Sequence, residues 1–124
     1  MSDGLRGVVV CHARLAEALT EAAEQITGVR GALVPVSNTG CDRGTLEERV
    51  AEAVNGEPAV VFVDLASGSC FFAVLNRLRG VAGVQVVTGV NLAMLVEFLF
   101  HRSLPAPEVA ARAVAAGGKA IGAR

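Results

Sequence analysis

The sequence has no Trp, no Tyr and only five Phe in 124 residues, and its Lys and Arg residues form no cluster. Its formal net charge is −1. Proteins that bind nucleic acids normally present a basic surface, and those that bind single strands add aromatic rings on which bases stack. Nucleic acid is therefore not expected as a partner.

Long hydrophobic runs and paired cysteines are also missing. The most tempting apolar stretch, 81–95, is interrupted by two glycines, Gln85 and Asn91, and is too polar for a membrane span. The first residues are polar and do not form a signal-peptide pattern. Three cysteines without C-x-x-C spacing favour reduced thiols. We expect a cytoplasmic protein in which residues 1–124 form a single domain.

Four short runs rich in Val, Leu and Phe alternate with segments of helical periodicity. These runs are expected to form strands over 6–11, 32–36, 59–64 and 84–88. Strands that alternate with helices predict parallel βαβ units with right-handed crossovers. The expected fold class is therefore α/β: a doubly wound, mainly parallel four-stranded sheet in the order 2-1-3-4, with helices on both faces.

The segments between the strands carry helix signals. The first helix is expected to bury a stripe with the i, i+3, i+4, i+7 spacing of a core-facing helix, made of Leu15, Ala18, Leu19, Ala22, Ala23 and Ile26. A second is expected to begin near Thr45, where Thr45-x-x-Glu48 matches a capping box, with an apolar stripe of Leu46, Val50 and Ala53.

Three more helices are expected in the second half of the chain. One covers 69–78, and another, capped by Asn91, runs to about 102. The buried residues of the Asn91-capped helix are expected to be Leu92, Leu95, Val96 and Leu99. The last helix is expected over 108 to about 116, before Gly117-Gly118.

His12 and Asp64 follow the first and third strands, which are neighbours in the order 2-1-3-4. Adjacent strands lie ~5 Å apart, so the two side chains are predicted to meet at the topological switch point, where such sheets bind ligands. Asp64 could hold one ring nitrogen of His12 and leave the other as a nucleophile, or it could simply cap the next helix.

A small turn, Ser67-Gly68-Ser69, comes next and opens a helix. Free N–H groups at a helix N-terminus favour an anion, although Ser69 also fits an ordinary N-cap. With His12 and Asp64 this turn predicts a histidine that receives a phosphoryl group. The sequence has no Walker motif and no G-x-G-x-x-G pattern, so a bound nucleotide is not expected.

Three segments carry a resemblance to a known family. They are the strand, histidine and helix start over 7–19, the strand, Asp and Gly-Ser turn over 61–69, and Thr88-Gly89-Val90-Asn91-Leu92-Ala93-Met94-Leu95-Val96-Glu97. Together they resemble the enzyme IIA domain of the mannose (mannose–fructose–sorbose) class of the bacterial phosphoenolpyruvate-dependent sugar phosphotransferase system. The third segment is the most specific, because a generic switch-point fold does not need it.

The resemblance implies a phosphoryl relay. His12 would accept the group from the histidine phosphocarrier protein and pass it to a IIB component, with Asp64 orienting the ring and Ser67, Gly68 and Ser69 around the phosphoryl group. It further implies a homodimer that needs no metal or other cofactor and associates peripherally with a membrane sugar permease.

The sequence departs from the family at several positions and leaves alternatives open. Cys70 and Ala93 replace family prolines, Phe72 replaces a frequent Asn, and Cys11 and Ala13 flank the histidine. One alternative is a regulatory phosphoprotein whose partner binding depends on His12 phosphorylation. Another is the phosphotransfer subunit of a dihydroxyacetone kinase.

A third alternative is a metal or redox function of Cys11 and Cys70, which both fall near the switch point. Cys11 is expected to face away from His12, and the sequence has no local metal-ligand spacing. Arg14 is expected to be a solvated first-turn residue. His101 fits the C-terminal end of a helix dipole.

Overall fold

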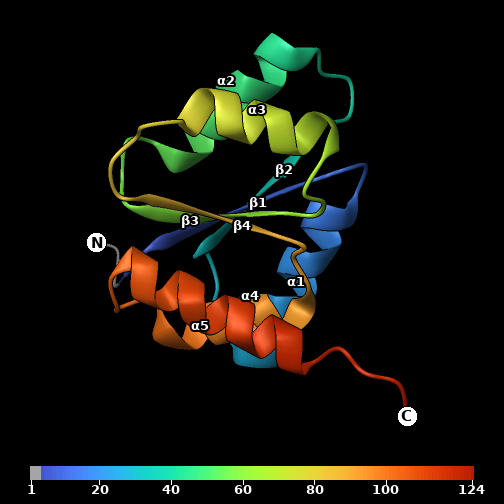
Figure 1. The fold of residues 1–124 in the computed structure, drawn as a ribbon, viewed down its shortest axis with the longest axis vertical. Helices are drawn as coiled ribbons and strands as arrows, with labels where there is room; N and C mark the ends of the chain where they lie inside the picture. Colours follow the sequence, from blue (N-terminus) through green and yellow to red (C-terminus); the bar gives the residue numbers. More distant parts are fainter. Residues whose placement is uncertain (1–3) are drawn as a thin grey trace.

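Four parallel strands form the central sheet of the structure, a computed structural model that describes residues 4–124 (Figure 1). They are β1 (Arg6–Cys11), β2 (Leu33–Ser37), β3 (Ala59–Val63) and β4 (Val84–Thr88), in the order β2-β1-β3-β4. β1 is central, and its Val8 lies opposite Val34 of β2 and Val61 of β3. The predicted fold class and strand order are confirmed.

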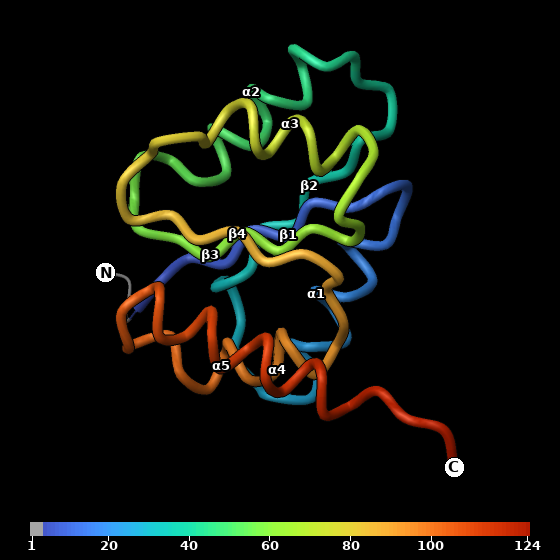
Figure 2. Tube along the Cα trace, viewed as in Figure 1, coloured from blue at the N-terminus to red at the C-terminus, as the bar shows by residue number. Residues whose placement is uncertain are grey.

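Helices cover both faces of this sheet. In the described part of the chain they are α1 (Leu15–Thr27), α2 (Arg43–Val54), α3 (Gly68–Leu78), α4 (Leu92–His101) and α5 (Ala106–Lys119). Figures 1 and 2 show α2 and α3 on one face and α1, α4 and α5 on the other. Because all strand pairs are parallel, the four strands end on the same side of the molecule. Ligands bind on this side in such folds.

The strand residues alternate between two cores. Val8 and Val10 of β1 pack under α2 and α3, whereas Val9 and Cys11 pack with the other helices. In that second core the rings of Phe62 and Phe98 meet edge to face, with their centroids 5.5 Å apart. Because both faces are covered, the strands carry continuous apolar runs without polar alternation.

The predicted stripe of α1 was only partly right, since Ala23 is buried and Leu19 packs against the core, but its other members are not buried. The buried residues are Ala16, Thr20 and Ala23, whereas Leu15 is 43% exposed and Ile26 is 58% exposed. Alanines are so frequent in this helix that two faces fit the spacing, and the structure buries the face with the smaller side chains. Small side chains allow the helix to lie close to the sheet and to α4.

The start of α2 also differs from the prediction. The N-cap is Asp42, whose Oδ1 accepts a hydrogen bond of 2.8 Å from the Thr45 main-chain N–H. The Thr45-x-x-Glu48 capping box was therefore wrong, because a carboxylate three residues earlier takes the N–H of Thr45. Hydrogen bonds from the Thr45 main chain and side chain lower the pKa of Asp42 from its ordinary value. The predicted stripe of Leu46, Val50 and Ala53 is buried as expected.

The predicted cap of α4 is confirmed, since Asn91 Oδ1 accepts a hydrogen bond of 3.1 Å from the Met94 N–H. Two of the four predicted core residues of this helix were wrong. The buried residues are Met94, Leu95, Phe98 and Leu99, while Leu92 and Val96 are only partly buried. The α5 helix, packed across α4, covers the helix face that carries Met94.

The α5 helix is longer than predicted at both ends. It begins at Ala106 with a proline in its first turn, where the missing N–H of proline costs no helical hydrogen bond. It also continues through Gly117 instead of ending there. This glycine serves to make room for α4 and does not end the helix. A Cβ at Gly117 would lie 2.5 Å from Met94 Cγ, and the Gly117 carbonyl accepts a hydrogen bond from Asn91 Nδ2.

Candidate functional site

His12 and Asp64 meet at the carboxyl ends of β1 and β3, as predicted. A single carboxylate oxygen, Asp64 Oδ2, lies 2.8 Å from His12 Nδ1 and accepts the His12 main-chain N–H at 2.9 Å. The other oxygen, Oδ1, accepts the Leu65 N–H at 3.0 Å. The Asp64 side chain is only 11% exposed, whereas that of His12 is 40% exposed. The acid is thus buried and partnered, and the histidine remains reachable from solvent.

This contact fixes the tautomer of the neutral imidazole. A carboxylate can only accept hydrogen bonds, so the proton of the ring sits on Nδ1. Nε2 then carries the free lone pair. The arrangement leaves one ring nitrogen held by an acid and the other available as a nucleophile.

The N-terminus of α3 lies beside that free nitrogen. Gly68, the first residue of α3, has a left-handed φ of +86°, and a Cβ there would lie 3.7 Å from both Nε2 and Cε1 of His12. The first N–H groups of a helix have no partner within it and form its positive end. They favour an anion placed near the nucleophilic nitrogen.

The two serines of the predicted turn have different positions. Ser67 is the N-cap residue of α3 and has an extended backbone, but its side chain makes no capping hydrogen bond. Ser69 is the second residue of the helix, so its interpretation as an N-cap was wrong. The helix begins at Gly68, one residue before the predicted start at Ser69, and its N-cap is Ser67.

Asn38 belongs to the site but was missed from the sequence. Its Oδ1 accepts the Ala13 N–H at 3.0 Å, and its Nδ2 donates to Ser69 Oγ at 3.4 Å. Ser37 Oγ donates to the Ala13 carbonyl at 2.6 Å. Ala13 itself has a left-handed φ of 53°. The end of β2 therefore holds the turn after His12 and connects it to α3.

A sequence signal for Asn38 did exist. Ser37-Asn38 is a polar pair at the end of an apolar strand, and in a parallel sheet that end lies on the same edge as His12. The sequence interpretation considered only the two strands that flank the switch point.

Cys11 and Cys70 are both buried free thiols. Burial, with a smaller contribution from the charge of Asp64, raises the pKa of Cys11 to about 12 and that of Cys70 to about 11. Cys11 packs in the core under α1, α4 and α5, and Cys70 in the core under α2 and α3. A redox pair needs accessible thiols of low pKa, so these two cysteines do not favour one.

The two remaining residues that the sequence analysis singled out, Arg14 and His101, lie at helix ends. Arg14 occupies the N-cap position of α1 and is exposed. His101 lies at the end of α4, where its Nδ1 is 3.0 Å from both the carbonyl oxygen and a carboxylate oxygen of Glu97. His101 is thus a helix-end residue, as expected.

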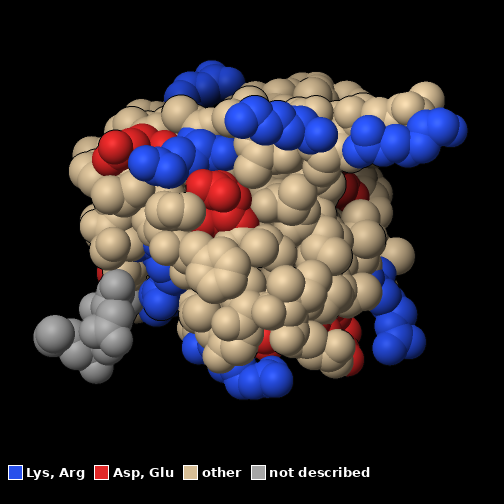
Figure 3. All heavy atoms as spheres, turned by 90° about the horizontal axis from the view of Figure 1, so that it is seen from below, with Lys and Arg blue, Asp and Glu red and all other residues tan. Residues whose placement is uncertain are grey.

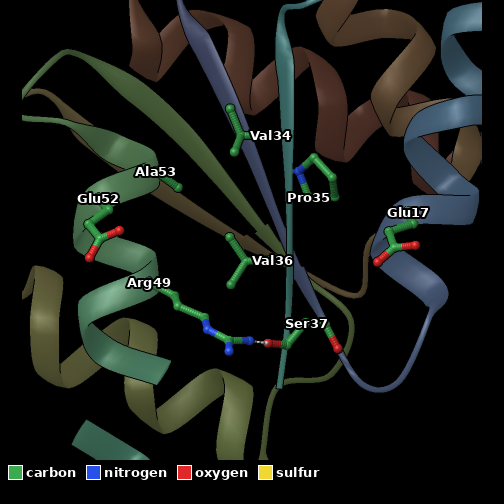
Figure 4. A pocket seen from close by; sticks show the side chains of 8 residues that line it. All are labelled: Glu17, Val34, Pro35, Val36, Ser37, Arg49, Glu52 and Ala53. Carbon is green, nitrogen blue, oxygen red and sulfur yellow. Dashed lines mark hydrogen bonds between the residues drawn. The ribbon is translucent and has the colours of Figure 1, made fainter. Parts of the chain in front are cut away.

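The largest hollow that we describe lies away from His12. It has about 440 Å³, and Figure 4 shows it on the outer side of β2, where Arg49 donates to the Ser37 carbonyl. A smaller hollow of about 80 Å³ borders the site and is lined by Asn38, Cys41, Asp42, Arg43, Leu46 and Ser69. His12 lines neither of them, and its side chain is 40% exposed to solvent. Within residues 4–124, no helix combines the length and apolarity needed to cross a bilayer.

Comparisons with known proteins agree with this architecture. One solved structure, a phosphotransferase system component EIIA from Streptococcus agalactiae, superposes with a TM-score of 0.86 at 18% identity over 96% of each chain. A mannose/sorbose-specific IIA subunit from Enterococcus faecalis gives 0.86 at 21% identity, over 98% of this chain and 95% of that one. A putative sugar phosphotransferase system permease from Klebsiella pneumoniae gives 0.84 at 16%, over 99% and 93%.

These identities are low, and the structural likeness therefore shows the fold alone. No curated protein matches the chain. The decisive match is to a family model described as "PTS system fructose IIA component", which covers residues 7–114. The chain belongs to this family, the enzyme IIA components of the mannose–fructose–sorbose class of the sugar phosphotransferase system.

Proposed function

We propose that this IIA component accepts a phosphoryl group on Nε2 of His12 from the histidine phosphocarrier protein and passes it to a IIB component. The observation that carries the proposal is the contact of 2.8 Å between His12 Nδ1 and Asp64 Oδ2, which leaves Nε2 free beside the first residue of α3. The family supplies the identity of the donor and the acceptor.

In the proposed reaction the Nε2 lone pair attacks the phosphorus of the carrier's phosphohistidine. The bond from phosphorus to Nε2 forms as the bond to the carrier's nitrogen breaks, and the electron pair returns to the carrier's imidazole. The ring of His12 gains positive charge during this step, and the Asp64 carboxylate stabilises it through Nδ1–H. Transfer to IIB is the same reaction with His12 as the donor.

The turn 67–69 stabilises the charge of the phosphoryl oxygens in this proposal. Phosphoryl transfer depends mainly on positioning and electrostatic stabilisation. The N–H groups at the start of α3 supply preorganised donors, with Gly68 allowing close approach and the hydroxyls of Ser67 and Ser69 nearby. No metal or other cofactor takes part in this mechanism.

The two histidines of the chain provide a matched test. The protein is incubated with phosphoenolpyruvate, enzyme I and the phosphocarrier, and the product is analysed by intact mass. Wild type and His101→Ala should gain one acid-labile phosphate, and His12→Ala should gain none. A phosphorylated His12→Ala protein, or an unmodified wild type beside an active carrier, contradicts the proposal.

The two other phosphoprotein functions share this first step and separate at the second. Transfer from phosphorylated His12 to a IIB component supports the relay. Phosphorylation that changes partner binding without onward transfer would support a regulatory protein. The Gly89-Val90-Asn91 segment favours the mannose class over the phosphotransfer subunit of a dihydroxyacetone kinase.

We also propose that residues 1–124 act as one cytoplasmic domain, that the chain is a homodimer, and that it associates peripherally with a membrane permease. Figure 3 views the molecule from the side of α1, α4 and α5, where the middle of the surface carries few charged groups. Large apolar side chains are exposed on these helices, among them Ile26, Phe100 and Val114. Sedimentation of the purified protein tests the dimer: a monomer at micromolar concentration contradicts it.

A further inference from the structure

The carboxyl end of the sheet gathers three side chains of metal-ligand types, of which the proposed relay uses His12 and Asp64 but not Cys70. A ring nitrogen of His12, a carboxylate oxygen of Asp64 and the sulfur of Cys70 all lie within 4.8 Å of one another. They come from the end of β1, the end of β3 and the first turn of α3. The three donors therefore come from three different elements, and the pairing of β1 with β3 brings the ends of these two strands together.

The donor set selects a class of cation. One nitrogen, one oxygen and one sulfur suit Zn²⁺ and related thiophilic ions, whereas Mg²⁺ and Ca²⁺ prefer oxygen alone. Bond lengths of about 2.0–2.3 Å at tetrahedral angles place ligand atoms roughly 3.3–3.7 Å apart. Side-chain movements on the order of 1 Å from the observed spacing are enough to reach that geometry.

Access to the cluster is open on one side. The His12 side chain is 40% exposed, so an ion can enter from solvent and a water molecule can occupy a fourth position. Cys70 closes the opposite side, because this residue of α3 is fully buried in the core between α2, α3 and the sheet. Three protein ligands with a fourth position open to water or substrate is an arrangement that zinc adopts in proteins.

We propose that His12, Asp64 and Cys70 bind a divalent thiophilic metal ion of the Zn²⁺ type. The metal–sulfur bond forms as the Cys70 thiol releases its proton to solvent, and no oxidant or reductant is required. The bound ion would either coordinate a ring nitrogen of His12 or hold the Asp64 carboxylate away from Nδ1, and the relay needs both a free Nε2 and this contact. Bound metal and phosphoryl transfer are therefore mutually exclusive, and this consequence rests on the proposed function.

Cobalt is a suitable probe, because a Co²⁺–thiolate bond gives a charge-transfer absorption band in the near ultraviolet. The reduced, unphosphorylated wild-type protein is titrated with Co²⁺ and then with Zn²⁺. Cys41→Ser is the matched control, since Cys41 is a free cysteine outside the cluster. We expect the band in wild type and Cys41→Ser, its absence in Cys70→Ser, and its loss when Zn²⁺ displaces Co²⁺.

Circular dichroism would show whether Cys70→Ser folds. If it does not, a second variant still tests the proposal. His12 is partly exposed, and His12→Ala should fold and lower the affinity for Co²⁺ by at least the ~10- to 100-fold that loss of an outer-shell partner costs. The proposal is overturned if wild type shows no band, if folded Cys70→Ser keeps it, or if His12→Ala binds Co²⁺ unchanged. No phosphoryl donor is present, so these failures are distinct from failure of the relay.

Discussion

Asp64 Oδ2 accepts two hydrogen bonds from His12, one from its main-chain N–H and one from its ring, although the two residues are 52 positions apart. The single oxygen therefore fixes both the position of the His12 main chain after β1 and the orientation of its imidazole ring. Orientation and tautomer come from the same contact.

Replacing this carboxylate should slow phosphoryl transfer without preventing folding. In Asp64→Asn the amide lacks the negative charge that stabilises the His12 ring as it becomes cationic. A hydrogen bond to a charged group contributes ~1.5–3 kcal/mol, so the rate constant should fall about 10- to 100-fold. Rapid-quench measurements with phosphorylated carrier would determine this rate. Asp42→Asn, which keeps an N-cap residue, should transfer at the wild-type rate; equal rates for Asp64→Asn and wild type would refute the pairing.

Two glycines separate backbone strain from the effect of a methyl group placed beside the nucleophile. Gly68 and Gly28 have similar left-handed φ values, +86° and +74°, but only at Gly68 would a Cβ approach His12. Gly68→Ala and Gly28→Ala should each lose about 1–2 kcal/mol of unfolding free energy, measured by denaturant titration. Only Gly68→Ala should also slow phosphorylation of His12. A comparable loss of rate in Gly28→Ala would mean that strain alone explains the effect.

Asn38 should affect transfer through charge and through its contact with Ser69. Asn38→Asp keeps an acceptor for the Ala13 N–H but removes the donor to Ser69 and adds a negative charge near the proposed phosphoryl position. Repulsion of about 1 kcal/mol corresponds to about a fivefold lower rate. The control is Asn76→Asp, which adds the same charge further along α3. If stopped-flow or quench kinetics give the same rate for both variants, Asn38 has no role at the site.

The Asp42 cap predicts a defined dependence of stability on pH. The pKa of Asp42 is lowered in the folded protein, so its contribution is present above the ordinary value of 3.8 and is lost as the pH falls through the folded-state pKa. Asp42→Ala should therefore melt at a lower temperature than wild type at neutral pH, and the difference should shrink as the pH falls below 3.8 and through the lowered pKa of Asp42. Glu48→Ala, which removes the other acid considered for this cap, should change the melting temperature less. Calorimetry gives the melting temperatures of the two variants and wild type at each pH. A difference between Asp42→Ala and wild type that is constant with pH would argue against charge-dependent capping.

The sheet and the central pair could be predicted because they depend on strong local patterns. Four uninterrupted apolar runs specify buried parallel strands, and their order then places residues that follow β1 and β3 side by side. Asn91 was predictable for the same reason, since its capping hydrogen bond lies within three residues. These features need no knowledge of how helices pack.

The errors concern contacts that only tertiary packing decides. The face of α1 depends on how closely Ala16 and Ala23 bring the helix to the sheet, and an alanine-rich sequence does not specify it. Gly117 looked like a helix end, but it is required for the close contact with Met94. The polar pair Ser37-Asn38 indicated which end of the sheet Asn38 occupies, but its partners, 25 and 31 residues away, depend on how the strands and α3 pack.

The all-parallel sheet also determines when the chemistry becomes available during folding. Sequential strands cannot pair through a tight turn, because a helix must cross over between them. The contacts of β1 are therefore non-local, and such contacts form slowly. The contact between His12 and Asp64 cannot form until β3 has been synthesised, because Asp64 lies 52 residues after His12. A nascent or partly folded chain therefore contains the histidine but not the paired nucleophile, so the site forms only when the centre of the sheet is complete.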